Sequence, residues 1–475
     1  MSLPVSEQPE QTSAAGEFER DPVPESSLLG FRSFVGMYAG EHCAGTELMI
    51  GPLFVASGVS AFDVVIGLLV GNLLAVMSWL LLTAPIATRS RLTLYWQLEK
   101  ICGRKLVILY NLANGIMFCF LAGSMITVSA TAAGVWFEFP MPGLNDTLPN
   151  SVGWVVAVFI VGLLISIVAA CGYETVSRFA GIAAPWMLLV FVAFGLVALR
   201  QFIDATGAIV DSPASLWSLC ETHIWTGQEP LPGQVKFTFW HVMFFAWFCN
   251  MAMHVGMSDL TIFRFAKKSW YGLATASGMY VGHFLAWLSA SLLYAIQLHA
   301  DPADTDVLPG PMAYRACGLA GLICVIVAGW TTANPTIYRA GLAFQAILPN
   351  ASRFKVTIVT GMLATVAGVF PAIAMKMLGF VAIYGLVLMP MGAVIFVDFY
   401  LLERFGLQSS YAEVSRTSFN LAAGLTWFLT LGVCTALVQF AGVQIFFVSL
   451  PGWFVAAALY VGLCRVYQSR APSAV

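Results

Sequence analysis

Residues 38–51 read YAGEHCAGTELMIG, and this stretch decides how the rest of the sequence is interpreted. It lies within a segment that is otherwise apolar from about residue 28 to residue 81. Glu41, His42 and Glu47 fall inside it, with glycines on either side. Ionisable residues are costly inside a membrane and usually line a cavity or pair with a partner. The stretch therefore predicts a membrane helix that is interrupted partway along its length.

The composition places the whole chain in a lipid bilayer. The 475 residues are 59% hydrophobic and only 10% charged, whereas a soluble domain carries about 25% charged residues. The mean hydropathy is +0.83. Apolar runs of about 20 residues cross a bilayer, and the sequence predicts twelve of them. They cover residues 28–56, 62–86, 105–133, 152–171, 178–200, 237–257, 271–297, 315–345, 355–373, 377–401, 417–440 and 443–466.

The basic residues predict the orientation of these spans. Lysine and arginine concentrate on the cytoplasmic side of a membrane protein. With the N-terminus inside and twelve alternating spans, all of the 22 basic residues fall inside except Arg200, Lys236, Arg315 and Lys376. We therefore expect a multi-pass protein of the cell membrane, plasma or inner, with both termini in the cytoplasm. No lysine or arginine is expected in the middle of the membrane, and Arg339 is assigned to the cytoplasmic side.

A second interrupted segment lies five spans after the first. Span 6 contains FFAWFCNMAMHVGMSDL over residues 244–260, in which Asn250, His254 and Asp259 break an apolar run. Interrupted segments at corresponding positions in two halves are typical of inverted-repeat transporters, which bind substrate and ions at the breaks. Spans 1 and 6 are therefore the candidate binding segments.

Span 8 carries oxygen atoms that a small hard cation could use. It contains VAGWTTANPTIYRAG over residues 327–341. Pro335 has no N–H, so the carbonyl of Thr331 loses its helical partner, and Thr331 and Thr332 add hydroxyl oxygens. The alternative is that these small residues pack helices together and their hydroxyls bond back to their own helix. The residues by themselves favour neither interpretation.

Enzymatic motifs are absent from the sequence. The ten cysteines are scattered and show no spacing typical of a metal site. There is no phosphate-binding loop, no nucleophile elbow and no zinc-protease motif. An enzyme or an ATP-driven pump is therefore not expected, and neither is a bound cofactor or a nucleic-acid partner.

Several motifs, in order along the chain, give a resemblance to a known family. They are DPVPESSLLGF (21–31), GVSAFDVVIGLLVGNLL (58–74), SDLTIFRFAKK (258–268), GWTTANPTIYRAGLAF (329–344) and MPMGAVIFVDFYLLER (389–404). The chain resembles the nucleobase–cation symporters, which include purine and cytosine permeases and hydantoin transporters. The third motif has two extra residues between Asp259 and Arg264, and the polar residues after WTT differ from the family pattern.

The resemblance implies a LeuT-type fold. This is an all-α membrane fold of twelve helices, with two inverted five-helix repeats, two further C-terminal helices and broken helices 1 and 6. The expected organisation is a disordered tail (1–27), a first repeat (28–203), an outer loop (204–236), a second repeat (237–403), helices 11 and 12 (404–467) and a C-terminal tail (468–475).

The resemblance also implies a sodium site between spans 1 and 8 and a substrate site at the breaks. The expected Na⁺ ligands are the carbonyls of Gly40, Cys43 and Ala328 and the hydroxyls of Thr331 and Thr332. A flat heterocycle would stack on aromatic rings and bond to amides. The candidate substrate-binding residues are Glu41, His42, Ala44, Gly45, Asn114, Phe118, Trp247, Asn250, His254 and Asn334.

The two glutamates of the opening stretch depart from the family pattern. We expect Glu47 to begin the second half-helix, where the positive end of the helix dipole favours a carboxylate. We expect Glu41 to end the first half-helix, where the dipole disfavours it. With no basic partner expected nearby, the charge would be matched by His42 or His254, Na⁺, a proton or a cationic substrate. The alternative is that both glutamates cap backbone N–H groups nearer the outer mouth.

Together these patterns predict a secondary-active symporter, a monomer that imports a nucleobase or a related nitrogenous compound with Na⁺ by alternating access. Three alternatives stay open: a symporter for an amine-bearing or cationic compound, a proton-coupled permease, and a sensor that does not transport.

Overall fold

The structure is a computed structural model that describes residues 17–143, 146–372 and 377–468. Within these residues the chain is helical, with only two isolated β-bridges. The first half contains α1 Phe31–His42, α2 Glu47–Ala56, α3 Ala61–Ser78, α4 Ala84–Ser90, α5 Leu94–Cys102, α6 Arg104–Phe137, α7 Val152–Ala170, α8 Tyr173–Thr206 and α9 Pro213–Leu219. The second half contains α10 Phe239–Phe248, α11 Met251–His254, α12 Leu260–Phe263, α13 Leu285–Ala300, α14 Pro309–Ile347, α15 Arg353–Gly368, α17 Met377–Tyr400, α18 Tyr411–Val414, α19 Leu421–Ala441 and α20 Ile445–Gln468.

Nine helical segments of the described residues are long and apolar enough to cross a membrane. Two shorter apolar helices, α2 and α10, accompany them. They occupy parts of spans 1 and 6, the spans that the sequence marks as interrupted. An all-helical membrane protein is therefore what the structure supports, while the number of twelve spans stays a prediction.

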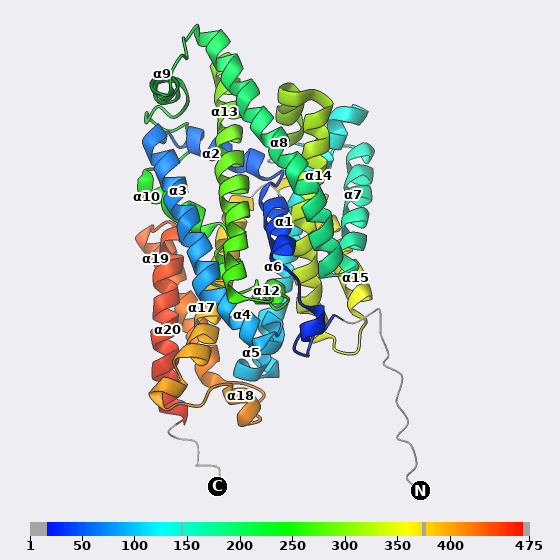
Figure 1. The fold of residues 1–475 in the computed structure, drawn as a ribbon, viewed down its shortest axis with the longest axis vertical. Coiled ribbons are helices and arrows are strands. Elements are labelled where there is room, and N and C mark those ends of the chain that lie inside the picture. Colours follow the sequence, from blue (N-terminus) through cyan, green and yellow to red (C-terminus); the bar gives the residue numbers. More distant parts are fainter. Residues whose placement is uncertain (1–16, 144–145, 373–376, 469–475) are drawn as a thin grey trace.

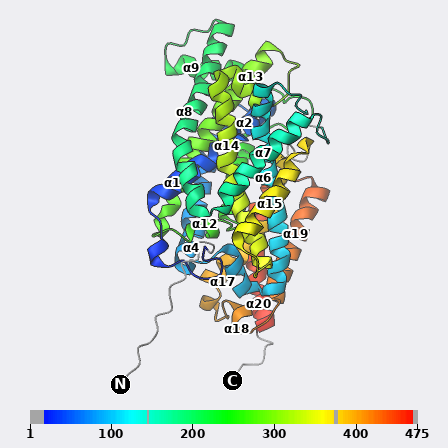
Figure 2. The ribbon, with the colours of Figure 1, turned by 90° about the vertical axis from the view of Figure 1, so that its right-hand side faces the viewer.

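The long helices run roughly along one axis and form an elongated bundle, with α9 near one end and α5 and α18 near the other (Figure 1). Helix α14 packs along α6, α1 along α8, and α2 along α13. Turning the molecule shows α6, α7 and α15 side by side (Figure 2). Six of the twelve residues of α1 and seven of the ten residues of α2 are buried, including the residues of α1 next to the break.

Small residues allow this close packing around α1. A β-carbon on Gly36 would lie 2.7 Å from Gly181 Cα, and one on Gly40 would lie 2.8 Å from Ala180 Cβ. Neither distance is possible without moving a helix. Small residues bring membrane helices close enough for backbone contact, so these positions hold α1 directly against α8.

The N-terminal segment differs from the expected tail. Residues 1–16 lie outside the described part of the chain, but residues 17–29 lie against the bundle. Val23 is buried, and its N–H donates to the carbonyl of Arg91. The carbonyls of Glu17 and Phe18 accept hydrogen bonds from Arg264, at 2.8 and 2.6 Å. A polar, proline-rich composition predicts disorder. Here, however, the buried Arg264 donates hydrogen bonds to the backbone carbonyls of this segment.

Candidate functional site

The first element of the site is the break between α1 and α2. Helix α1 ends at His42, and Cys43 leaves the helical region with ψ 52°. Helix α2 begins at Glu47, four residues later in the chain. The N–H of Cys43 still bonds to the carbonyl of Ala39, at 3.0 Å, so the first helix ends with its last turn closed. The carbonyls of Ala44, Gly45 and Thr46 accept hydrogen bonds from the first N–H groups of α2, so the break is a short turn that joins two separate helices.

The second element is the interruption of span 6. Helix α10 ends at Phe248, and only the short helices α11 and α12 continue the segment. Between them Met257 has a φ of 62°, in the left-handed region. This conformation costs a non-glycine residue about 1–2 kcal/mol. Phe263 of α12 stacks on Phe34 and Tyr38 of α1, with ring centroids 5.5 Å apart in both pairs. The two interrupted segments therefore pack directly on each other.

A buried cavity of about 60 Å³ lies where these segments meet. Such a volume holds a few water molecules, so a heterocyclic compound could enter only after the helices move. The residues that line it come from α1, α2, α6, the span 6 interruption, η5 (the π-helical segment Ser277–Phe284), α14 and α17. The lining residues are Glu41, His42, Thr46, Glu47, Ile50, Leu121, Met125, Cys249, Asn250, Met253, His283, Thr332, Thr336 and Tyr384.

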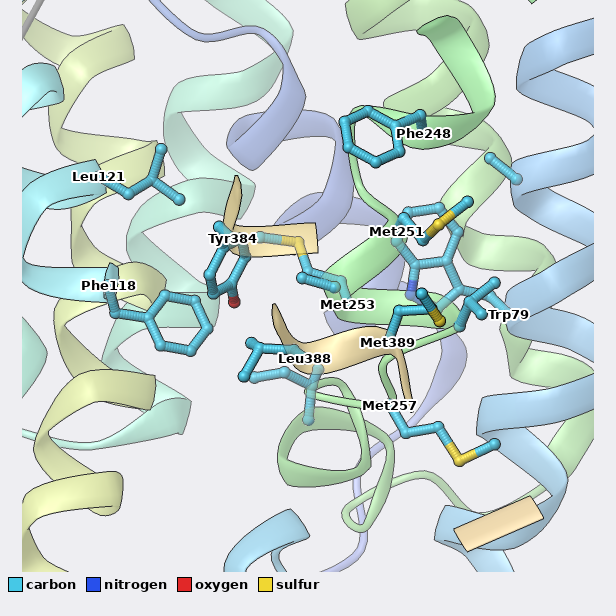
Figure 3. Close-up of a cluster of buried hydrophobic side chains, with 14 of the residues drawn as sticks. Trp79, Phe118, Leu121, Phe248, Met251, Met253, Met257, Tyr384, Leu388 and Met389 are labelled. Carbon is cyan, nitrogen blue, oxygen red and sulfur yellow. The ribbon is translucent and has the colours of Figure 1, made fainter. Parts of the chain in front are cut away.

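One wall of this region is apolar and rich in methionine. Figure 3 shows Met253 beside Tyr384 and Met251 and Met389 near Trp79, and of these residues Met253 and Tyr384 line the cavity. Phe118 and Tyr384 pack edge to face, with centroids 4.9 Å apart. Methionine side chains are flexible and adapt to different shapes, so this wall is suited to repacking around a flat compound.

An ion-pair network of three residues lies beside the cavity and is fully buried. Arg339 Nη1 donates to Glu41 Oε1 at 2.6 Å, and Arg339 Nη2 donates to Asp259 Oδ1 at 2.6 Å. Tyr38 and Trp79 donate to the other oxygen of Asp259, at 2.6 and 2.7 Å. The network joins the last turn of α1, the interruption of span 6 and α14.

This network corrects the expectation that Glu41 has no basic partner. Arg339 was assigned to the cytoplasmic side, but its side chain is 0% exposed and lies within α14. The sequence did not predict its ion pairs, because a lone arginine near the end of an apolar run is typical of a flanking charge. Its guanidinium pairs instead with the carboxylates of Glu41 and Asp259, which are distant in the sequence. Neither His42, Na⁺ nor a cationic substrate is needed to balance Glu41.

Glu47 has a different environment. It is the first residue of α2, and it is buried. The indole N–H of Trp287 donates to its Oε2, and His283 Nε2 lies 3.7 Å from its Oε1. In the described part of the chain it forms no ion pair with lysine or arginine. His283 was missed by the sequence analysis, since a single histidine in an apolar span forms no local pattern.

The other predicted substrate residues divide between the cavity and its surroundings. Glu41, His42 and Asn250 line the cavity, and Ala44 and Gly45 lie in the break beside it. Trp247 donates to Ser78 at 3.0 Å, while His254 bonds to the carbonyl of Trp247 and packs on Trp79. Neither residue lines the cavity in this conformation. The same holds for three buried residues of α6 and α14, which are Asn114, Phe118 and Asn334.

The predicted sodium ligands lie on either side of the contact between α1 and α14. Thr332 Oγ1 donates to the carbonyl of Glu41 at 2.8 Å and to that of Ala328 at 3.0 Å. Thr331 Oγ1 donates to the same Ala328 carbonyl, also at 3.0 Å. Cys43 and Ala328 belong to one buried cluster, whereas Gly40 packs on α8. Both hydroxyls thus bond back to their own helix, and Thr332 also reaches one oxygen of α1, the carbonyl of Glu41, which was not among the predicted ligands.

Comparison with known proteins gives likeness in structure alone. No family model and no curated protein sequence matches the chain. The structure of Mhp1, a nucleobase-cation-symport-1 family transporter in a closed conformation with bromovinylhydantoin bound, matches with a TM-score of 0.69 and 14% identity, over 96% of both chains. A Na⁺-coupled sialic acid symporter in an outward-open state matches with a TM-score of 0.65 and 14% identity, over 92% of this chain and 89% of that one.

The chain has the LeuT-type fold. MhsT in complex with L-phenylalanine also matches, with a TM-score of 0.55 and 16% identity, over 89% of this chain and 98% of that one. The three matches show that transporters of different substrates share this LeuT-type fold. The fold therefore confirms the expected architecture class and says nothing by itself about what this chain carries.

Proposed function

We propose that the chain is a cation-coupled symporter that imports a nucleobase or a related small nitrogenous compound by alternating access. One observation carries the proposal: the two interrupted segments meet at a buried cavity with polar and aromatic walls. In transporters built on inverted repeats, substrate and ions bind at such breaks. The bound hydantoin of Mhp1 supports a flat nitrogen heterocycle as the substrate class.

Sodium is the coupling ion we propose. The contact of the Thr332 hydroxyl with the Glu41 carbonyl of α1 and the Ala328 carbonyl of α14 supports it, because neutral oxygens from both helices lie together there. Alternating access follows from linkage: a cation held between α1 and α14 favours the state in which both helices face it. Substrate binding against α1 then favours closure.

The remaining parts of the proposal concern topology. We propose twelve spans with two inverted five-helix repeats, broken helices 1 and 6, cytoplasmic termini and a monomer in the cell membrane. The five sequence motifs that carry the family resemblance and the fold of the matched transporters support this arrangement. No enzymatic activity and no cofactor belong to the proposal.

A cationic substrate is a weaker candidate than the sequence suggested. The main argument for it was an unpaired Glu41, but Arg339 pairs with that residue. Glu47 is the only remaining acidic group among the described residues that line the cavity. A neutral heterocycle that bonds to Asn250 and His42 fits the cavity better than a substrate with a full positive charge.

Counterflow in proteoliposomes tests the proposal. Purified protein would be reconstituted with unlabelled uracil, cytosine, hydantoin or allantoin inside, and uptake of the same radiolabelled compound would be followed. We expect counterflow for at least one of these compounds, dependent on Na⁺ and lost in Asn250→Leu. Asn350→Leu, at an exposed position outside the site, is the matched control. Counterflow of none of these compounds would overturn the substrate class.

A further inference from the structure

The cavity contains a group of titratable side chains that the sodium mechanism does not use. Glu47 lies within 3.7 Å of His283, and the His283 ring lies 4.7 Å from that of His42. All three side chains are at most 5% exposed, and all three line the cavity. They come from α2, η5 and α1. Glu47 and His283, a carboxylate and an imidazole in contact at one cavity, are an arrangement that can hold a proton.

The hydrogen bonds of this group are incomplete. His42 Nδ1 bonds to the carbonyl of Tyr38 at 2.8 Å, but His42 Nε2 is buried without a partner. His283 stacks on Trp287 with centroids 4.3 Å apart, and its Nδ1 is also buried without a partner. Buried polar atoms are nearly always paired. Two unpaired ring nitrogens that belong to residues lining one cavity therefore indicate that something they bond to enters it.

The neighbouring charges do not balance Glu47. Arg339 is already shared by Glu41 and Asp259. The other titratable groups close to Glu47 are the thiols of Cys43 and Cys249, which cannot supply positive charge. Burial of an uncompensated carboxylate costs several kcal/mol. A proton held between Glu47 and His283 is the simplest way to avoid this cost.

We propose that Glu47 and His283 form a proton-binding site on the central cavity, and that its proton is carried together with the substrate. The proton would enter from the outer water, reside on the Glu47 carboxyl beside His283, and leave when the cavity opens to the other side. Trp287, which donates to Glu47, is a positioning residue. The coupling part of this inference rests on the proposed symporter function, whereas the proton site does not.

Infrared difference spectroscopy tests the proton site without any substrate. The carbonyl band of protonated carboxyl groups would be titrated in purified wild-type protein, in Glu47→Gln and in the control Glu221→Gln, at an exposed position. We expect one component of the pH-dependent band, present in the wild type and in the control, to be missing in Glu47→Gln. In Trp287→Phe and His283→Gln the band should remain and its midpoint pH should move. Identical titrations of the wild type and Glu47→Gln would overturn the proton site.

Proteoliposomes with a pH-sensitive dye inside test the coupling. Uracil, cytosine, hydantoin and allantoin would each be added outside, with a pH gradient or a Na⁺ gradient imposed in turn. We expect internal acidification with the transported compound, and in Glu47→Gln a lower ratio of protons to compound taken up. Transport without acidification in the wild type would overturn the coupling. If no compound of this panel is taken up, the substrate class fails, and the infrared titration still decides the proton site.

Discussion

The guanidinium of Arg339 lies 2.6 Å from the carboxylate of Glu41, and both side chains are almost completely buried. Arg339 belongs to α14, while Glu41 belongs to the last turn of α1 before its break. The same guanidinium bonds to Asp259 in the interruption of span 6. One side chain thus ties together the three segments around the cavity. Any movement that opens the cavity between these segments has to keep, stretch or exchange these bonds.

Replacement of Arg339 should strongly destabilise the protein. In Arg339→Met, Glu41 loses its ion pair and Asp259 keeps only Tyr38 and Trp79 as donors. Removing one partner of a buried ion pair costs about 3–5 kcal/mol. We expect a lower melting temperature in detergent, and partial recovery in Arg339→Met with Glu41→Gln, because the double variant no longer buries an unpaired Glu41 carboxylate.

Two further variants serve as controls for this prediction. Glu41→Gln alone should cost less than Arg339→Met, since Arg339 and Asp259 remain as a neutral pair. Arg178→Met, which breaks an exposed pair with Glu174, should change the melting temperature little. A melting temperature of Arg339→Met equal to that of Arg178→Met would show that the network does not stabilise the fold.

Part of this site could be predicted from the sequence, and the rest could not. Glycine and polar residues within an apolar run predicted an interruption between Glu41 and Glu47, because such residues are rare in continuous spans, and the structure has a break between His42 and Glu47. The pairing of Arg339 with Glu41 could not be found in this way. It depends on how α14 crosses α1, and a basic residue near the end of an apolar run is usually a flank. His283 was missed for the same reason, since its only signal is its contact with Glu47.

Thr332 should influence Na⁺ binding more than the other hydroxyls of α14. Its hydroxyl lies between the carbonyls of Glu41 and Ala328, where both helices meet. In Thr332→Val this oxygen is replaced by a methyl group, which removes one ligand of the proposed site. The loss of one polar partner is worth about 1–3 kcal/mol. We expect the stabilisation by Na⁺ in a thermal-shift titration to require a correspondingly higher Na⁺ concentration.

The matched control for Thr332→Val is Thr360→Val on α15. The Thr360 hydroxyl bonds only to its own helix, through the carbonyl of Val356. Its loss should leave the Na⁺ titration unchanged. Equal Na⁺ titrations for Thr332→Val and the wild type would exclude Thr332 as a ligand, and a wild type indifferent to Na⁺ would exclude the sodium site altogether.

Gly282 of η5 holds span 7 against the end of α1. A β-carbon at this position would lie 2.4 Å from the carbonyl oxygen of His42 and 2.5 Å from its carbon. Backbone atoms cannot yield as a flexible side chain can, so Gly282→Ala should push η5 away from the break. We expect a loss of counterflow greater than the loss of stability, because the displaced segment carries His283.

The control for Gly282→Ala is Gly432→Ala in α19, where nothing lies within 4 Å of the added β-carbon. Alanine favours a helix over glycine by about 1 kcal/mol, so this variant should be as stable as the wild type or more so. Counterflow of Gly282→Ala at the level of Gly432→Ala would mean that the contact with His42 does not determine the geometry of the cavity.

Arg264 should hold the N-terminal segment against the bundle. Its guanidinium is 0% exposed, bonds to the carbonyls of Glu17 and Phe18, and lies 4.4 Å from the ring of Phe265. Arg264→Met removes these donors but retains an apolar side chain of similar length. Hydrogen exchange in the peptide that covers residues 17–30 should then become faster, because its backbone bonds depend on that contact. Lys267→Met, three residues later and exposed, should leave the exchange unchanged. If both variants exchange like the wild type, the segment is held by its other contacts, such as that of Val23 with Arg91, and not by Arg264.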